Sequence, residues 1–161
     1  MKAFTAIEML VTLAVLGILL AFSFPYFRTM LESRRTRGAA EMLMSDIQMA
    51  RMESVKRSAP VSISFSVASW CYGVSANPLC DCDSNPGACD IRTVNGSDFP
   101  GTRLEEDFDD DRLVFNPVRN TANMGTATFS SQGKSYSVKV NALGHARICQ
   151  PGAPSGSNLS C

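Results

Sequence analysis

The chain has 161 residues, of which 45% are hydrophobic and 19% are charged, and its basic and acidic side chains cancel to a formal net charge of zero. It contains one histidine, and it has neither a glycine-rich phosphate-binding loop nor a serine elbow between a strand and a helix. These features give no catalytic constellation. We therefore expect a protein that is not an enzyme and that binds neither a cofactor nor a metal.

The N-terminal segment combines a long apolar run with an acidic residue at its start. Residues 9–27 carry no charged side chain, and Glu8 immediately precedes them. As a helix, this run would span roughly 28 Å, close to the thickness of a hydrocarbon core. A plain membrane anchor gives Glu8 no role, although a carboxylate in lipid is costly and usually functional. A secretory signal peptide would have a shorter apolar stretch of about 7–15 residues, despite the cleavage-like sequence at 21–23.

We therefore expect residues 4–27 to form a transmembrane and assembly helix. Its carboxylate at Glu8 would be neutralised by a positive group on another chain.

Three residues of this segment stand at fixed distances from Phe4. Counting from Phe4, Glu8 is the fifth residue, Gly17 the fourteenth and Pro25 the twenty-second. Together with the short basic start and the Phe-Thr-x-x-Glu sequence, these spacings resemble those of type IV prepilins. In that family the three positions hold an assembly glutamate, a glycine that loosens the helix and a proline that kinks it.

The resemblance to prepilins implies how the N-terminus is processed. Residues 1–3 would form the leader, which prepilin peptidase removes between Ala3 and Phe4, and Phe4 would then be N-methylated. Ala3 stands where the family usually has glycine, and its small side chain still predicts cleavage, at a reduced rate. Glu8 would pair with the new terminal amine of a neighbouring subunit, which fixes the axial register because an unpaired buried carboxylate is penalised.

Before assembly, the resemblance places the chain in the inner membrane, in contact with its lipids, as a single-pass protein. Lys2 would stay in the cytoplasm, and the C-terminal domain would lie in the periplasm.

An amphipathic stretch follows the apolar run and continues the predicted helix. Residues 28–57 carry a stripe of apolar and small side chains at helical spacing, formed by Ala39, Ala40, Leu43, Ile47, Ala50 and Ser54. Glu53 and Arg57, outside this stripe, have the spacing of a helical ion pair. Pro60 predicts the end of the helix.

From Val61 the periodicity of apolar residues changes to two, which predicts strands. The expected strands are residues 61–67, 70–74, 113–115, 127–130, 136–140 and 147–149. A turn at residues 131–134 predicts a hairpin between the fourth and the fifth. A long helix followed by strands alone predicts an α+β fold of pilin-like type, with the helix packed on an antiparallel β-sheet of the domain at 58–161.

The six cysteines all lie in the part of the chain that is expected outside the cytoplasm. An even number there predicts a disulfide framework rather than a thiolate metal site. Cys149 and Cys161 are the expected pair, because their bond would close a tail rich in proline, glycine and serine. The pairing of the other four is open among three possibilities; they are Cys71, Cys80, Cys82 and Cys89.

The charges are unevenly distributed along the domain. Residues 58–111 carry two basic and ten acidic side chains, whereas residues 112–161 carry five basic and no acidic ones. This polarity indicates either a head-to-side contact between subunits or an anion-binding face beside a repulsive acidic flank. The acidic run at 105–111 lacks the spacing and central glycine of a calcium loop, which favours a solvated connection.

Several segments together resemble a narrower family. The long helix, the strand at 61–67 and the segments 70–73 and 143–149 are similar to the minor pilins FimT and FimU and the type II secretion pseudopilin GspH. The resemblance implies a minor pilin of a type IV pilus, which joins other minor pilins and the major pilin in a tip or priming complex on the inner-membrane assembly platform. Such a pilus reaches the cell surface and supports twitching motility and adhesion. The alternatives are a DNA-capture minor pilin of a competence pilus and a type II secretion pseudopilin of the GspH type.

Some FimT proteins bind DNA through a C-terminal Gly-Arg-x-Arg motif. The matching sequence here is Gly-His-Ala-Arg, in which Arg147 is kept and His145 replaces the first arginine. Because a neutral histidine neutralises no phosphate, this change should weaken DNA binding and flatten its salt dependence. His145, Arg147 and Lys139 are the candidate DNA contacts, and the favoured interpretation of the first two is the exposed face of a final strand.

Overall fold

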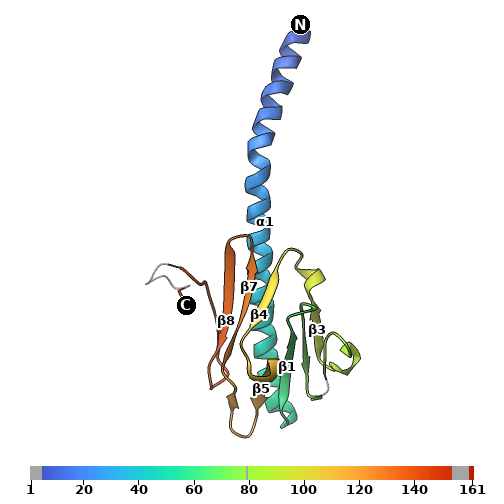
Figure 1. Cartoon of the computed structure of the whole chain (residues 1–161), viewed down its shortest axis with the longest axis vertical. Helices are drawn as coiled ribbons and strands as arrows, with labels where there is room; N and C mark the ends of the chain where they lie inside the picture. The colour runs from blue at the N-terminus through green and yellow to red at the C-terminus, as the bar shows by residue number, and fades with distance from the viewer. Residues whose placement is uncertain (1–4, 79, 154–159) are drawn as a thin grey trace.

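The computed structural model describes residues 5–78, 80–153 and 160–161, and for residues 22–26 it describes the backbone only. Helix α1 (Ala6–Arg57) spans 52 residues, and its N-terminal half projects beyond the domain (Figure 1). The Thr5 hydroxyl caps the first turn by accepting a hydrogen bond from the Glu8 N–H at 3.4 Å. At the other end, Ser58 adopts a left-handed conformation and its N–H donates to carbonyls of the last turn. The helix thus ends where Pro60 predicted.

The helix is continuous through Gly17 and Pro25, so neither residue ends it. The loosening at Gly17 and the kink at Pro25 stay predictions. Ala3 and Phe4 lie outside the described residues. In the part of the chain that the structure describes, no helix is both long enough and apolar enough to cross a membrane.

Two antiparallel sheets lie beside the C-terminal half of α1, in the orders β3-β2-β1-β5-β6 and β4-β7-β8-β9 (Figure 1). The strands of the first sheet are β1 (Val61–Ser66), β2 (Cys71–Ser75), β3 (Arg92–Asn95), β5 (Arg112–Asn116) and β6 (Thr121–Ala122). Those of the second are β4 (Arg103–Glu106), β7 (Gly125–Ser131), β8 (Lys134–Val140) and β9 (Ala146–Cys149). Short 3-10 helices are η1 (Pro86–Ala88), η2 (Gly96–Asp98) and η3 (Asp109–Asp111).

The core lies between α1 and the two sheets. The whole predicted stripe of α1, from Ala39 to Ser54, is at most 2% exposed. Ile63 of the first sheet and Phe129 of the second are both fully buried in the same hydrophobic cluster. Because burying a large apolar side chain contributes about 1.5–3 kcal/mol, this contact fixes α1 on the domain.

Six of the expected strands are present, each within two residues of its predicted limits. The sequence missed β3, β4 and β6, and it predicted one sheet where there are two. The reason is that β3 and β4 each bury a single side chain, Val94 and Leu104, and β6 has only two residues. Segments this short contain too few alternating apolar and polar residues for a period of two to be recognised in the sequence.

The prediction that the acidic run at 105–111 is a solvated connection is correct only in part. It is not a purely solvated connection, because its first two residues belong to β4, which pairs with β7. Phe108 within it is 5% exposed, and its ring stacks on that of Phe65 with centroids 5.2 Å apart. The carboxylates at 109–111 are exposed, as expected.

Candidate functional site

The projecting half of α1 is the first candidate site. Its apolar side chains are exposed, for example Ile7 at 72% and Leu10 at 69%. Glu8 lies exposed in the first turn, where its negative charge complements the helix dipole. A single subunit therefore leaves a long apolar surface without a partner, and such surfaces mark contacts with a protein or a membrane.

The predicted DNA contacts do not form one group. Lys139 and Arg147 are directly paired across β8 and β9, and they lie on the outer face of the sheet because their neighbours Val138 and Ile148 pack on the core. His145 instead lies before β9 and lines a groove of about 760 Å³ with Arg51 and other residues of α1. The structure thus pairs two of the three candidates on the sheet, whereas the third lines the groove beside α1.

The turn before β9 explains why glycine precedes His145. Gly144 has a positive φ of +70°, and its N–H donates to the carbonyl of Asn141 at 2.8 Å. A Cβ at this position would lie 2.9 Å from the ring of Phe115, which is buried. Gly144 is therefore required by the fold, whatever the neighbouring residues bind.

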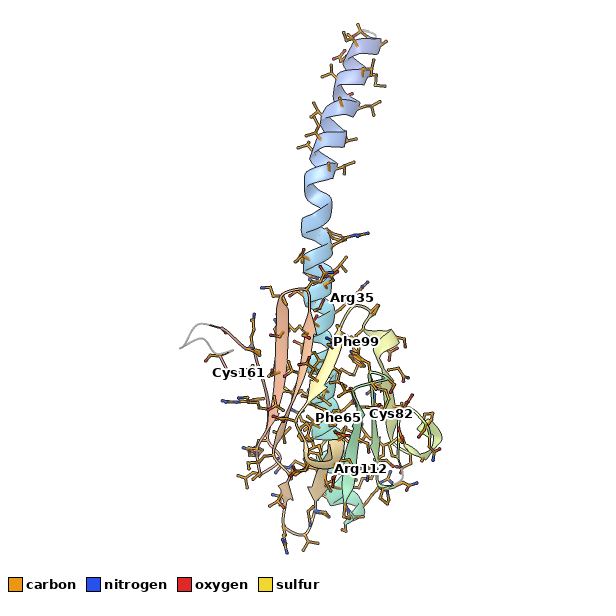
Figure 2. The ribbon with its side chains drawn as sticks, in the orientation of Figure 1. Arg35, Phe65, Cys82, Phe99, Arg112 and Cys161 are labelled. Atoms are coloured by element: carbon orange, nitrogen blue, oxygen red, sulfur yellow. A yellow bond between two sulfur atoms is a disulfide. The ribbon has the colours of Figure 1, made fainter. Side chains whose placement is uncertain are left out.

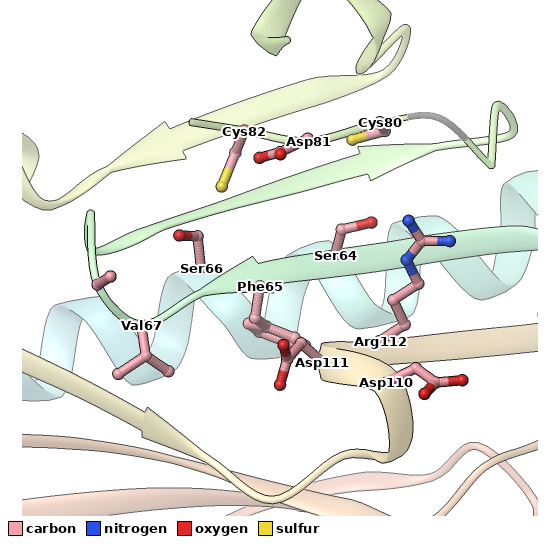
Figure 3. A pocket seen from close by; sticks show the side chains of 11 residues that line it. Ser64, Phe65, Ser66, Val67, Cys80, Asp81, Cys82, Asp110, Asp111 and Arg112 are labelled. Atoms are coloured by element: carbon pink, nitrogen blue, oxygen red, sulfur yellow. The ribbon is translucent and has the colours of Figure 1, made fainter. Parts of the chain in front are cut away.

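An acidic hollow of about 410 Å³ lies between the end of β1, the segment Cys80–Asp81–Cys82 and η3 (Figure 3). Asp81, Asp110 and Asp111 line it beside the single cation Arg112. The Ser84 hydroxyl donates to Asp81 at 2.5 Å and is the main cause that lowers the pKa of this carboxyl. The described residues contain no group of side chains placed to bind a metal ion.

The six cysteines form three disulfides. Cys149 is joined to Cys161, the pair that the sequence predicted. The other bonds, which the sequence left open, join Cys71 to Cys82 and Cys80 to Cys89. The first fastens the segment after β2 onto that strand, and the second closes a loop within that segment. Gly73 of β2 makes room for the second bond, because a Cβ there would lie 2.6 Å from the sulfur of Cys80.

A buried polar cluster connects α1 to the first sheet, and sequence reasoning missed it. Asp46 is fully buried, and it accepts hydrogen bonds from the Tyr72 hydroxyl at 2.8 Å and from the Arg92 guanidinium at 3.1 Å. Burial raises the pKa of Asp46, although the bonds from Tyr72 and Arg92 oppose this shift. Burial also raises the pKa of Tyr72, together with the charge of Asp46. The available signal was a carboxylate, Asp46, at a position between Leu43 and Ala50 of the stripe.

A long N-terminal helix that projects from a domain of antiparallel sheets defines a pilin-like protein. Residues 39–144 match the family model of the type II transport protein GspH. Because this match covers more than half of the chain, the protein belongs to the GspH family.

Two solved structures show a similar fold. The minor pseudopilin EpsH of the type 2 secretion system of Vibrio cholerae has a TM-score of 0.55 and 11% identity, over 73% of this chain and 98% of EpsH. The type IV minor pilin FimU of Pseudomonas aeruginosa has a TM-score of 0.52 and 20% identity, over 78% of this chain and 93% of FimU. The comparison with curated proteins gave no match. Together these findings support a minor pilin or pseudopilin of the FimT/FimU/GspH type.

Proposed function

We propose that the protein is a minor pilin of a type IV pilus and joins a tip or priming complex that initiates pilus assembly. The observation that carries this proposal is the exposed apolar half of α1, which begins with Glu8 and has no partner surface in the described chain. Neighbouring subunits would cover this surface in the filament, and the inner membrane would cover it before assembly. The role is structural and involves no catalysis.

The N-terminal boundaries form part of the same proposal. Prepilin peptidase removes residues 1–3 and exposes the amine of Phe4, which is then methylated. Residues 4–27 anchor the subunit in the inner membrane, residues 28–57 carry the helix into the domain, and the domain at 58–161 lies in the periplasm. The assembly platform transfers the subunit to a complex with other minor pilins and the major pilin.

The replacement Glu8→Gln tests the assembly role. It keeps the shape of the side chain but removes the charge that would pair with the neighbour's terminal amine. We expect the variant to accumulate in the inner membrane at the normal level and to be depleted from sheared pili at least tenfold, which corresponds to about 1.4 kcal/mol. Quantitative immunoblots of membrane and pilus fractions measure both amounts.

Glu32→Gln is the matched control, because it removes the same charge from α1 outside the apolar run. Normal incorporation of the Glu8→Gln variant would contradict the assembly role. Mass analysis of the N-terminus is an independent check, since the proposal requires a mature chain that begins with methylated Phe4.

A role in DNA capture is a second candidate. The adjacent cations Lys139, which is half-buried, and Arg147, which is exposed, favour it, because residues 112–161 contain no acid that would repel phosphate. Gel shifts of the full chain in detergent, with and without Arg147→Ala, would show salt-sensitive binding that the variant weakens. His145→Arg should strengthen it. Absent or salt-insensitive binding would remove this candidate.

A pseudopilin of a type II secretion system is the third possibility, since EpsH shares the fold. Deletion of the gene separates the two systems. Our proposal predicts loss of surface pili and twitching with normal protein secretion, and the opposite result would assign the protein to secretion.

A further inference from the structure

Basic side chains gather where α1 leaves the domain. Arg34 and Arg37 of α1, with Lys134 and Tyr136 of β8, line a hollow of about 400 Å³. A second hollow, of about 610 Å³, extends from Lys134 to Arg103 at the start of β4. Figure 1 shows the turn between β7 and β8 at the end of the domain from which α1 projects.

We define the basic collar by the five exposed cations around this exit, which are Arg34, Arg35, Arg37, Arg103 and Lys134. Figure 2 shows Arg35 at the same end of the domain. The acids of α1 nearest to the collar are Glu32 and Glu41. Glu41 forms an ion pair with Arg37 at 2.8 Å, but both side chains stay more than half exposed, so solvent screens this pair. Five cations against two acids leave the collar positive.

The collar lies close to the proposed membrane surface. The uncharged run ends at Phe27. Along the helix axis, Arg34 lies about 10 Å and Arg37 about 15 Å beyond that residue. The headgroup layer extends about 5–8 Å beyond the hydrocarbon, and charges act over about 10 Å at ordinary ionic strength. Long arginine side chains can therefore reach the phosphate layer.

The other side chains at this exit fit an interface between lipid and water. Phe27, Met30 and Leu31 are 61%, 45% and 37% exposed on the helix just before the collar. Tyr136 is half-buried and lines the first hollow together with Arg34 and Arg37. An aromatic ring and exposed apolar groups below a ring of cations are typical of residues at headgroup depth.

We propose that, before assembly, the basic collar docks the domain onto the anionic phospholipid headgroups of the periplasmic leaflet. The proposal rests on the membrane anchoring proposed above, and adds to it a second contact, made by the domain itself. Because this contact is electrostatic, it is reversible, and it is given up when the subunit moves into the filament.

Lysine acylation in vesicles tests the contact. The full chain is reconstituted into vesicles of phosphatidylcholine alone, or with about 30 mol% phosphatidylglycerol, whose negative charge makes the surface potential. A water-soluble amine reagent is added, and mass spectrometry follows each lysine. We expect Lys134 to react several-fold more slowly in the anionic vesicles at low salt, and to regain its reactivity at about 0.5 M salt, where screening is strong. Lys56 and Lys139 lie away from the collar and should react equally in both vesicles.

A pair of variants assigns the effect to the collar. Arg34→Gln with Arg37→Gln should abolish the protection of Lys134 by anionic lipid; both residues are exposed, so the fold should tolerate the change. Arg119→Gln, which removes an exposed cation far from α1's exit, should leave the protection unchanged.

Three outcomes would overturn the proposal. If Lys134 reacts as fast as Lys56 in both vesicles at low salt, no anionic contact exists. If Lys134 is equally slow in both vesicles, another copy of the chain, not lipid, covers the collar. A protein that fails to float with either vesicle would overturn the membrane anchoring as well, which distinguishes the two proposals.

Discussion

At the scale of single residues, one buried carboxylate decides how α1 meets the first sheet. Asp46 accepts from Tyr72 of β2 and Arg92 of β3, so its partners come from two adjacent strands. A buried charge with satisfied partners stabilises little in net terms, but it is costly to leave unpaired. The cluster therefore penalises any other rotation or register of α1 on the sheet.

The replacement Asp46→Asn should change the pH dependence of stability. Because burial raises the pKa of Asp46 in the folded chain above its ordinary value of 3.8, the folded state binds the proton more tightly than the unfolded state does. Its contribution to stability is therefore fully present below that ordinary value and is lost as pH rises through the folded pKa. We expect the free energy of unfolding of the native chain, minus that of the variant, to fall as pH rises above this ordinary value.

Urea unfolding of both chains in detergent, at a series of pH values and constant ionic strength, measures this difference. The other titrating groups are common to both chains and cancel. If the difference in free energy of unfolding rises with pH instead, the hydrogen bonds from Tyr72 and Arg92 outweigh the effect of burial on the pKa of Asp46.

At the scale of elements, the segment between β2 and β3 depends on its disulfides. Between Asn77 and Asp90 the buried side chains of the described residues are Cys80 and Cys82, and the regular structure is the short helix η1. This segment cannot fold by apolar burial. The bonds to β2 and across the segment take the place of a core.

Replacing Cys80 and Cys89 together by alanine should loosen this segment. The bond closes a loop of about ten residues, and its loss should lower the free energy of unfolding by about 2–3 kcal/mol. Amide hydrogen exchange in residues 76–91 should accelerate, while exchange in β7 and β8 stays slow. Replacing Cys149 and Cys161 by alanine is the control, since that bond lies on the other sheet and should leave exchange in residues 76–91 unchanged. Unchanged exchange in the first variant would show that other contacts hold the segment.

At the scale of the whole molecule, the uneven distribution of charge along the sequence becomes opposite charge on two flanks of the domain. The segment around β3 carries Asp81, Asp83, Asp90 and Asp98 on one flank of the domain. The strands β8 and β9 lie on the other flank and carry Lys139 and Arg147 (Figure 1). Opposite charges on opposite flanks are complementary when subunits of this type lie side by side.

Replacing Lys139 and Arg147 by glutamine should therefore weaken contacts with neighbouring pilins. We expect several-fold less co-purification with the other minor pilins at low salt, and a smaller difference at high salt, where the native contact is also screened. Arg119→Gln, an exposed cation in the loop between β5 and β6, is the control. Co-purification that does not depend on Lys139 and Arg147 would exclude this flank as the contact.

The sequence alone determined the features that depend on local pattern. The helical stripe from Ala39 to Ser54, the stop at Pro60 and the hairpin of β7 and β8 all follow from spacing along the chain. The pair Cys149 and Cys161 was predictable too, because their bond closes a short tail. Periodicity is a local property, and a single sequence displays it directly.

Only the tertiary structure decided which distant residues meet. The tertiary structure determined the pairing of four cysteines, brought Tyr72 and Arg92 to Asp46, and placed His145 in the groove beside α1. It also brought Lys134 and Arg103 to the exit of α1. These contacts depend on the order and register of the strands, and a shift of one residue would turn each side chain to the opposite face. The physical reason is that register is fixed by the packing of the whole core, which no local stretch of the sequence contains.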